Sequence, residues 1–182
     1  MSTANCVLVF FKEIRLGDVR KHQAESSDSN TGGGARDLRA APAAAFQQVL
    51  ERMFRHPGPV GGVTQGLVQW TTGSGEQQNA TVELWPPTDA RDNELRLARF
   101  YEISGWGVDE QEYNQALTTG ERWFYVLELH ADNTVWARVL HQGNINREDP
   151  LVAKHLRERM AATPRNQSVR GAVDLVTGQM FP

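Results

Sequence analysis

A glycine-rich stretch with two arginines is the first part of this sequence that could do chemistry. The segment SSDSNTGGGARDLR, residues 26–39, places Arg36 and Arg39 directly after three consecutive glycines. Glycine lets the backbone come close to a ligand, and a guanidinium group suits phosphates, carboxylates and guanine edges. The stretch is therefore compatible with a phosphate-binding loop, a recognition arm or a long flexible connection.

The known nucleotide-phosphate motifs are absent from this stretch. No GK[ST] follows the glycines, as it does in a Walker A motif, and no GxGxxG opens a helix after a strand. A nucleotide-phosphate loop is therefore disfavoured, and the flexible connection stays open. The two arginines favour recognition, because a loop that only connects has no need of them.

A second arginine-rich stretch, DARDNELRLAR at residues 89–99, has a similar make-up. Its three arginines are nearly balanced by three acidic residues: Arg91, Arg96 and Arg99 against Asp89, Asp92 and Glu94. On spacing alone, a salt-bridged surface in solvent is the simplest interpretation. Two such stretches beside predicted strands instead favour a pair of recognition arms, since arginine makes bidentate hydrogen bonds.

Metal-binding and nucleophilic chemistries find little support. The five histidines show no zinc-ligand spacing and no HExxH motif, and no GxSxG elbow is present. Cys6 lies at the start of a predicted buried strand and is expected to be a small core residue. The acidic residues Asp109, Glu110 and Glu112 favour a solvated turn or helix start over a cation site. We expect neither a metal nor another cofactor.

Two alternatives from other functional classes remain open. A small nuclease could use the loop that contains His22, Glu25, Asp28, Arg36 and Asp37 together with a divalent metal. With only three lysines in the chain, at positions 12, 21 and 154, a typical metal-nuclease site is hard to build. The other alternative is a protein-interaction module whose acidic middle meets a basic partner.

The charges are distributed unevenly along the 182 residues. Residues 1–55 hold eight Lys and Arg against six Asp and Glu, and residues 138–182 hold seven against four. Residues 56–137 hold four against twelve, so the three nets of +2, +3 and −8 add up to −3. The two ends together can supply a basic face for a polyanion, with the acidic middle elsewhere.

Composition indicates a globular cytoplasmic protein, with 40% hydrophobic and 23% charged residues. A single cysteine excludes an internal disulfide, and the apolar run CVLVFF is too short to cross a membrane. A buried strand is predicted at residues 7–14, followed by a polar loop over residues 17–37. Pro42 would then occupy the first turn of an amphipathic helix whose apolar face is Phe46, Val49, Leu50, Met53 and Phe54.

The remaining pattern is mainly β. Hairpins are predicted for residues 66–72 with 79–85 and for residues 122–130 with 134–141, with a further strand at 94–103. A helix at 149–160 and a strand at 171–176 follow. Many short strands with two or more helices predict one domain over residues 1–182, an open β-barrel capped by short helices.

In its order of elements the chain resembles the DNA-recognition pseudobarrel of EcoRII-type (Type IIE) restriction endonucleases, which is related to the plant transcription-factor pseudobarrel. The residues that carry the resemblance are a first strand VLVFFKEIRL, a glycine-rich arm SNTGGGARDLRAAP and a helix AAAFQQVLERMF. A strand with a second basic arm, ATVELWPPTDARDNELRLARF, comes next. A final hairpin and helix, WFYVLELHADNTVWARVLHQGN and EDPLVAKHLRERM, complete it.

The resemblance implies a protein that grips double-stranded DNA with two arms in the major groove, residues 31–39 and 91–99. Arg36, Arg39, Arg96 and Arg99 would contact guanine bidentately. Asp37 and Glu94 would accept from cytosine or hold neighbouring arginines. The other expected contacts are Ser29, Asn30 and Asn93 to adenine or phosphate, and Arg20, Lys21 and His22 to phosphates, with Thr31, Gly33 and Arg91 within the arms. Catalysis would belong to a nuclease domain or subunit of a restriction or phage-defence system.

Overall fold

The computed structural model describes residues 5–23, 38–88, 94–100, 108 and 110–182. Within them the strands are β1 (Cys6–Glu13), β2 (Leu38–Pro42), β3 (His56–Pro57), β4 (Thr64–Thr71), β5 (Gln77–Trp85), β6 (Glu94–Ala98), β7 (Trp123–His130), β8 (Val135–His141), β9 (Arg170–Asp174) and β10 (Met180–Phe181). The helices are α1 (Leu16–Gln23), α2 (Ala43–Met53), α3 (Glu110–Thr119), the 3-10 helix η5 (Gln142–Arg147) and α4 (Pro150–Ala162). None of the helices in the described ranges is long and apolar enough to cross a membrane.

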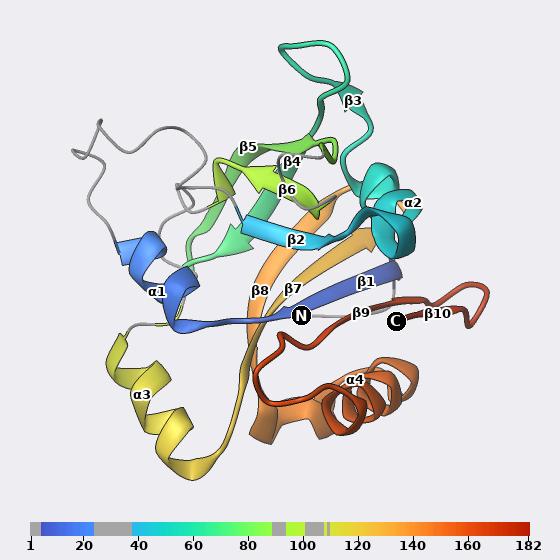
Figure 1. Ribbon diagram of the computed structural model, residues 1–182. Helices are drawn as coiled ribbons and strands as arrows, with labels where there is room; N and C mark the ends of the chain where they lie inside the picture. Colours follow the sequence, from blue (N-terminus) through green and yellow to red (C-terminus); the bar gives the residue numbers. More distant parts are fainter. Residues whose placement is uncertain (1–4, 24–37, 89–93, 101–107, 109) are drawn as a thin grey trace.

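The ten strands form one strongly curled sheet in the order β10-β9-β1-β7-β8-β4-β5-β6-β2, with β3 added beside β4 (Figure 1). Described neighbours pair antiparallel except β4 and β8, which meet in parallel at Val68 with Val135 and Gln69 with Trp136. The curl brings strands together that are distant in this order. Glu94 of β6 lies 3.2 Å from Arg170 of β9. The predicted fold class is confirmed: the protein is mainly β, an open barrel with short helices.

Strand β1 is buried on both of its faces. Leu8 and Phe10 belong to the inner core of the curled sheet, whereas Val9 and Phe11 belong to a second core on the outer side. This alternation follows from the pleat, which turns successive side chains to opposite faces. The run VLVFF is apolar throughout because neither face meets water.

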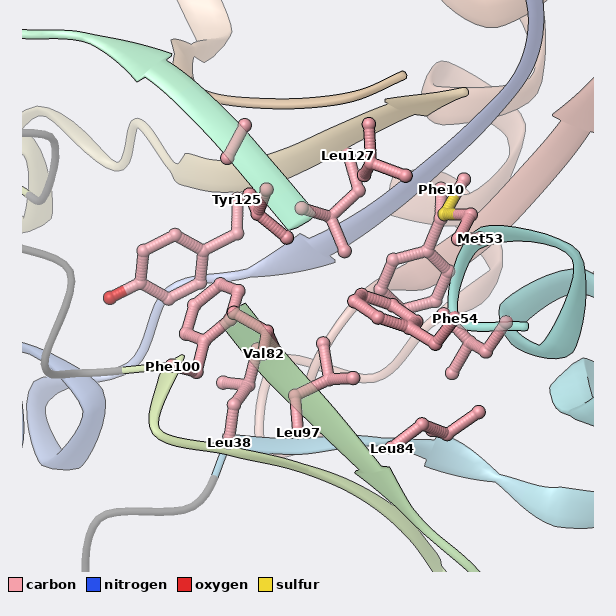
Figure 2. Close-up of a cluster of buried hydrophobic side chains, with 14 of the residues drawn as sticks. Phe10, Leu38, Met53, Phe54, Val82, Leu84, Leu97, Phe100, Tyr125 and Leu127 are labelled. Atoms are coloured by element: carbon pink, nitrogen blue, oxygen red, sulfur yellow. The ribbon is translucent and has the colours of Figure 1, made fainter. Parts of the chain in front are cut away.

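Helix α2 packs on the inner core and α4 on the outer core. Four of the five predicted apolar positions lie in α2 and Phe54 directly follows it, and all five are buried. Phe46 meets Phe10 edge to face with ring centroids 5.7 Å apart. Figure 2 shows this inner cluster, with Phe10, Met53 and Phe54 on one side and Tyr125 and Phe100 on the other. On the outer side, α4 buries Val152, Ala153 and Leu156 against the second core.

The predicted hairpins and helices are confirmed, with small changes in their bounds. Strands β4 and β5 pair from Thr64 with Leu84 to Thr71 with Gln77, and β7 pairs with β8. Helix α4 begins at Pro150, and the side chain of Asp149 accepts a hydrogen bond from the Leu151 amide at 2.8 Å. Asp149 therefore caps the helix.

Three expectations near the arms were wrong. The predicted loop over residues 17–37 begins as helix α1, which buries Val19. Pro42 ends strand β2 instead of opening the helix, which starts at Ala43. Strand β6 ends at Ala98, because Arg99 has a positive φ of 63° that breaks the extended backbone.

Gly171 is required where β9 crosses the second core. A Cβ there would meet the ring of Phe11 and lie 2.9 Å from Nε2 of His155. We expect Gly171→Ala to lower the free energy of unfolding by about 1–3 kcal/mol through overpacking. The measurement is urea unfolding followed by tryptophan fluorescence. Gly73→Ala is the matched control, because a Cβ at Gly73 meets nothing within 4 Å, and equal effects of the two changes would contradict the assignment.

Candidate nucleic-acid interface

Both predicted arms lead into one pair of neighbouring strands. Strand β2 is at the end of the sheet, and β6 pairs with it antiparallel. In their register Arg39 is the partner of Arg96, and Leu38 is the partner of Leu97. Two stretches that are more than fifty positions apart in the sequence therefore meet at one edge of the barrel.

Apolar side chains fix β6 and β2 at this edge. Leu38, Leu95 and Leu97 are at most 1% exposed and belong to the inner core. On its other side β6 pairs with β5, where Trp85 is the partner of Arg96. The leucines thus hold the strand from which Arg96 projects.

Arg96 is a half-buried arginine without an ion pair among the described residues. Its Nε atom is buried and has no hydrogen-bond partner there. Three other half-buried arginines have carboxylate partners: Arg122 lies 3.5 Å from Glu13, Arg138 lies 2.7 Å from Glu128, and Arg170 lies 3.2 Å from Glu94. A guanidinium without such a partner is a candidate for binding an external anion or a base edge.

Arg99 lies where β6 ends. It is exposed and has the positive φ noted above. The next residue, Phe100, is 1% exposed and packs edge to face on Tyr125 with centroids 5.1 Å apart (Figure 2). The buried Phe100 ring fixes the chain directly after Arg99, so the position of this arginine at the barrel edge is well defined.

Glu94 holds an arginine, one of the two roles considered for it. Its Oε1 atom accepts a hydrogen bond from Nη1 of Arg170 at 3.2 Å, and both side chains are at most 20% exposed. A carboxylate in this ion pair is less suited to accept from cytosine. One acidic residue of the second arm, Glu94, is thus explained by its ion pair with Arg170.

The predicted phosphate contacts Arg20, Lys21 and His22 lie in the second half of helix α1. The first turn of this helix is held by Asp18, whose carboxylate lies 2.8 Å from Nζ of Lys12 and accepts the Arg15 amide at 2.9 Å. Along the chain, α1 follows β1 and precedes the glycine-rich stretch.

The remaining predicted contacts lie outside the described residues. They are Ser29, Asn30, Thr31, Gly33, Arg36, Asp37, Arg91 and Asn93. Of the nuclease alternative, Glu25, Asp28, Arg36 and Asp37 lie there as well. Among the residues that are described, no group of three or more His, Cys, Asp and Glu could hold a metal ion.

Sequence reasoning missed Lys12, Asp18 and Arg170, which support the bases of the arms. Lys12 is 3% exposed, and burial lowers the pKa of its ammonium group, while Asp18 acts against this shift. No local pattern predicts these partners, because Glu94 and Arg170 are 76 positions apart. The only signal in the sequence was Lys12 itself, because a lysine inside an apolar strand needs a buried carboxylate as its partner.

Comparison of the sequence with models of known protein families and with curated proteins finds no match.

Cys6 is predicted to be an unreactive thiol. It is half-buried against the second core, and burial, followed by the charge of Glu128, raises the pKa of the thiol to about 12. At pH 8 the thiolate fraction falls about a thousandfold relative to a cysteine with the ordinary value of 9.0. We expect disulfide exchange with an aromatic disulfide reagent to be slower by at least about a hundredfold in the native protein than in guanidinium. Equal rates in the two conditions would contradict this account.

Proposed function

We propose that this chain binds duplex DNA sequence-specifically and reads the major groove with residues 31–39 and 91–99. In this proposal the curled sheet is a rigid base, and the arms leave it from the β2–β6 edge. The resemblance to the EcoRII-type recognition pseudobarrel suggests the mode of binding, and the mainly β open barrel is compatible with it.

The observation that carries the proposal is the pairing of Arg39 with Arg96 at the barrel edge. Like charges at directly opposite positions of two strands are destabilising. Arg96 has no acidic partner in the described part of the chain, and its buried Nε is without a hydrogen bond there. Arg96 is still partly exposed, and guanine O6 and N7 in a DNA groove would offer acceptors to its other N–H groups.

The acidic residues of the arms favour base reading over non-specific attraction. The net charge of −3 gives the protein as a whole no electrostatic attraction to DNA, so binding would depend on the local arrangement of its basic residues. Glu94 is already paired with Arg170, so it adds no uncompensated charge at the edge. Affinity must then come from a few directed contacts, which is the property of a sequence-specific binder.

In its biological setting the protein would be the recognition part of a restriction or other phage-defence system in the cytoplasm. As the resemblance implies, we assign cleavage to a separate nuclease domain or subunit.

Arg96→Ala is the direct test of the interface. Selection from a random duplex pool, followed by fluorescence anisotropy on the enriched duplex, should give one short motif for the wild-type protein. The variant should lose preference at one base pair and bind about 10- to 100-fold more weakly, as expected for one bidentate contact of about 1–3 kcal/mol.

Arg147→Ala is the matched control, because Arg147 is exposed on η5, outside the β2–β6 edge. It should leave both the motif and the affinity unchanged. If the wild-type protein retains no duplex even at low salt, the proposed function is wrong. If both variants lose affinity equally for all sequences, only a general electrostatic attraction is present.

A further inference from the structure

Two cations face each other in the barrel wall. Lys12 of β1 and Arg170 of β9 are partners in the antiparallel register. Lys12 is 3% exposed, and the side chain of Arg170 is 20% exposed. Arg170 lowers the pKa of Lys12 further, in addition to burial, so the two charges interact. Such a pair is unfavourable unless each cation has its own carboxylate.

The two carboxylates come from different parts of the chain. Asp18, in the first turn of α1, lies 2.8 Å from Nζ of Lys12. Glu94, the first residue of β6, lies 3.2 Å from Nη1 of Arg170. Helix α1 precedes residues 24–37, and β6 follows residues 89–93. Asp18 therefore lies in the helix that precedes the first proposed arm along the chain, and Glu94 lies in the strand that forms part of the second arm.

The four residues carry two positive and two negative charges, and Arg15 also acts on Lys12. Removing Asp18 leaves the buried Lys12 without its carboxylate, which is strongly unfavourable. The charge of Lys12 then acts more strongly on Arg170, its partner in the register, and so on the ion pair of Arg170 with Glu94. Within such a network the effects of two substitutions are not additive.

We propose that Lys12 and Arg170 are positioning residues that form a shared anchor for helix α1, which precedes the first arm, and strand β6, which belongs to the second arm, so that loosening one of these elements loosens the other. The assignment of the arms to DNA rests on the proposed function. The coupling itself involves only α1, β6 and the Lys12–Arg170 pair, and it exists without DNA.

Native-state amide hydrogen exchange, measured by mass spectrometry without DNA, tests the coupling. Asp18→Asn should speed exchange in α1 and also in β6, and Glu94→Gln should speed exchange in β6 and also in α1. The expected increase in the distant element is about two- to hundredfold, the range of coupling between residues of one network. Glu158→Gln is the matched control, because Glu158 is exposed on α4 and pairs with Lys154, and it should change neither element.

A double variant separates electrostatic coupling from simple loss of structure. Lys12→Met combined with Asp18→Asn removes one cation together with its carboxylate, so no uncompensated charge remains beside Arg170. Exchange in β6 should return to the wild-type rate, although α1 is still loosened. A structural effect of Asp18→Asn alone would persist in the double variant.

Several outcomes would overturn the shared anchor. These are a response confined to α1 in Asp18→Asn and to β6 in Glu94→Gln, or fast exchange in β6 that persists in the double variant. If Asp18→Asn does not fold, the response of α1 to Glu94→Gln decides the question, since that ion pair is less buried.

Measuring the affinity for the selected duplex separates a failure of the shared anchor from a failure of the proposed DNA function. With a shared anchor, Asp18→Asn and Glu94→Gln each weaken binding, and the combined variant weakens it less than the product of the two. Coupled exchange in a protein that binds no duplex would support the anchor and refute the DNA function. Duplex binding with uncoupled exchange would support the DNA function and refute the shared anchor.

Discussion

The burial of strand β1 on both faces is the constraint on which the rest of the structure depends. One face completes the inner core through Leu8 and Phe10, and the other completes the outer core through Val9 and Phe11. Every residue from Leu8 to Ile14 is buried, so the polar residues at the end of this strand must find partners within the protein. Lys12 meets Asp18, and Glu13 accepts the Val169 amide at 2.9 Å. A central apolar strand thus determines where internal ion pairs form and, through them, where α1 begins.

The sequence was most informative where structure is local. The five apolar positions of α2 recur at helical spacing, and the two hairpins are bounded by short polar turns, so both were predictable from neighbouring residues. Helix α1 was missed because its sequence, LGDVRKHQ, is mostly polar, and because Asp18 in its first turn pairs with the distant Lys12. Strand β2, with the sequence LRAAP, has weak strand propensity. It forms because it pairs with β6, which lies more than fifty positions later in the sequence.

The candidate interface was predictable only in part for the same reason. Residue type and glycine content pointed to the arginines, and their register at one edge comes from the pairing of β2 with β6. The difference between Arg96 and Arg170 was not visible in the sequence, since both lie among alternating apolar residues. It arises because the curl of the sheet brings Glu94 to Arg170 and leaves Arg96 without a carboxylate in the described part of the chain.

The pairing of β1 with β9 also has a consequence for how the protein is made. Leu8 pairs with Asp174, so the central strand gains one of its two neighbours only after residues up to 174 have been synthesised. Until then Phe10 and Phe11, in a run of five apolar residues, have an open strand edge beside them, which is a site for wrong pairing with other chains. Contacts of such long sequence separation also slow folding. The sheet is therefore completed around β1 by one of the last strands along these residues, and until β9 pairs, one edge of the apolar central strand stays open.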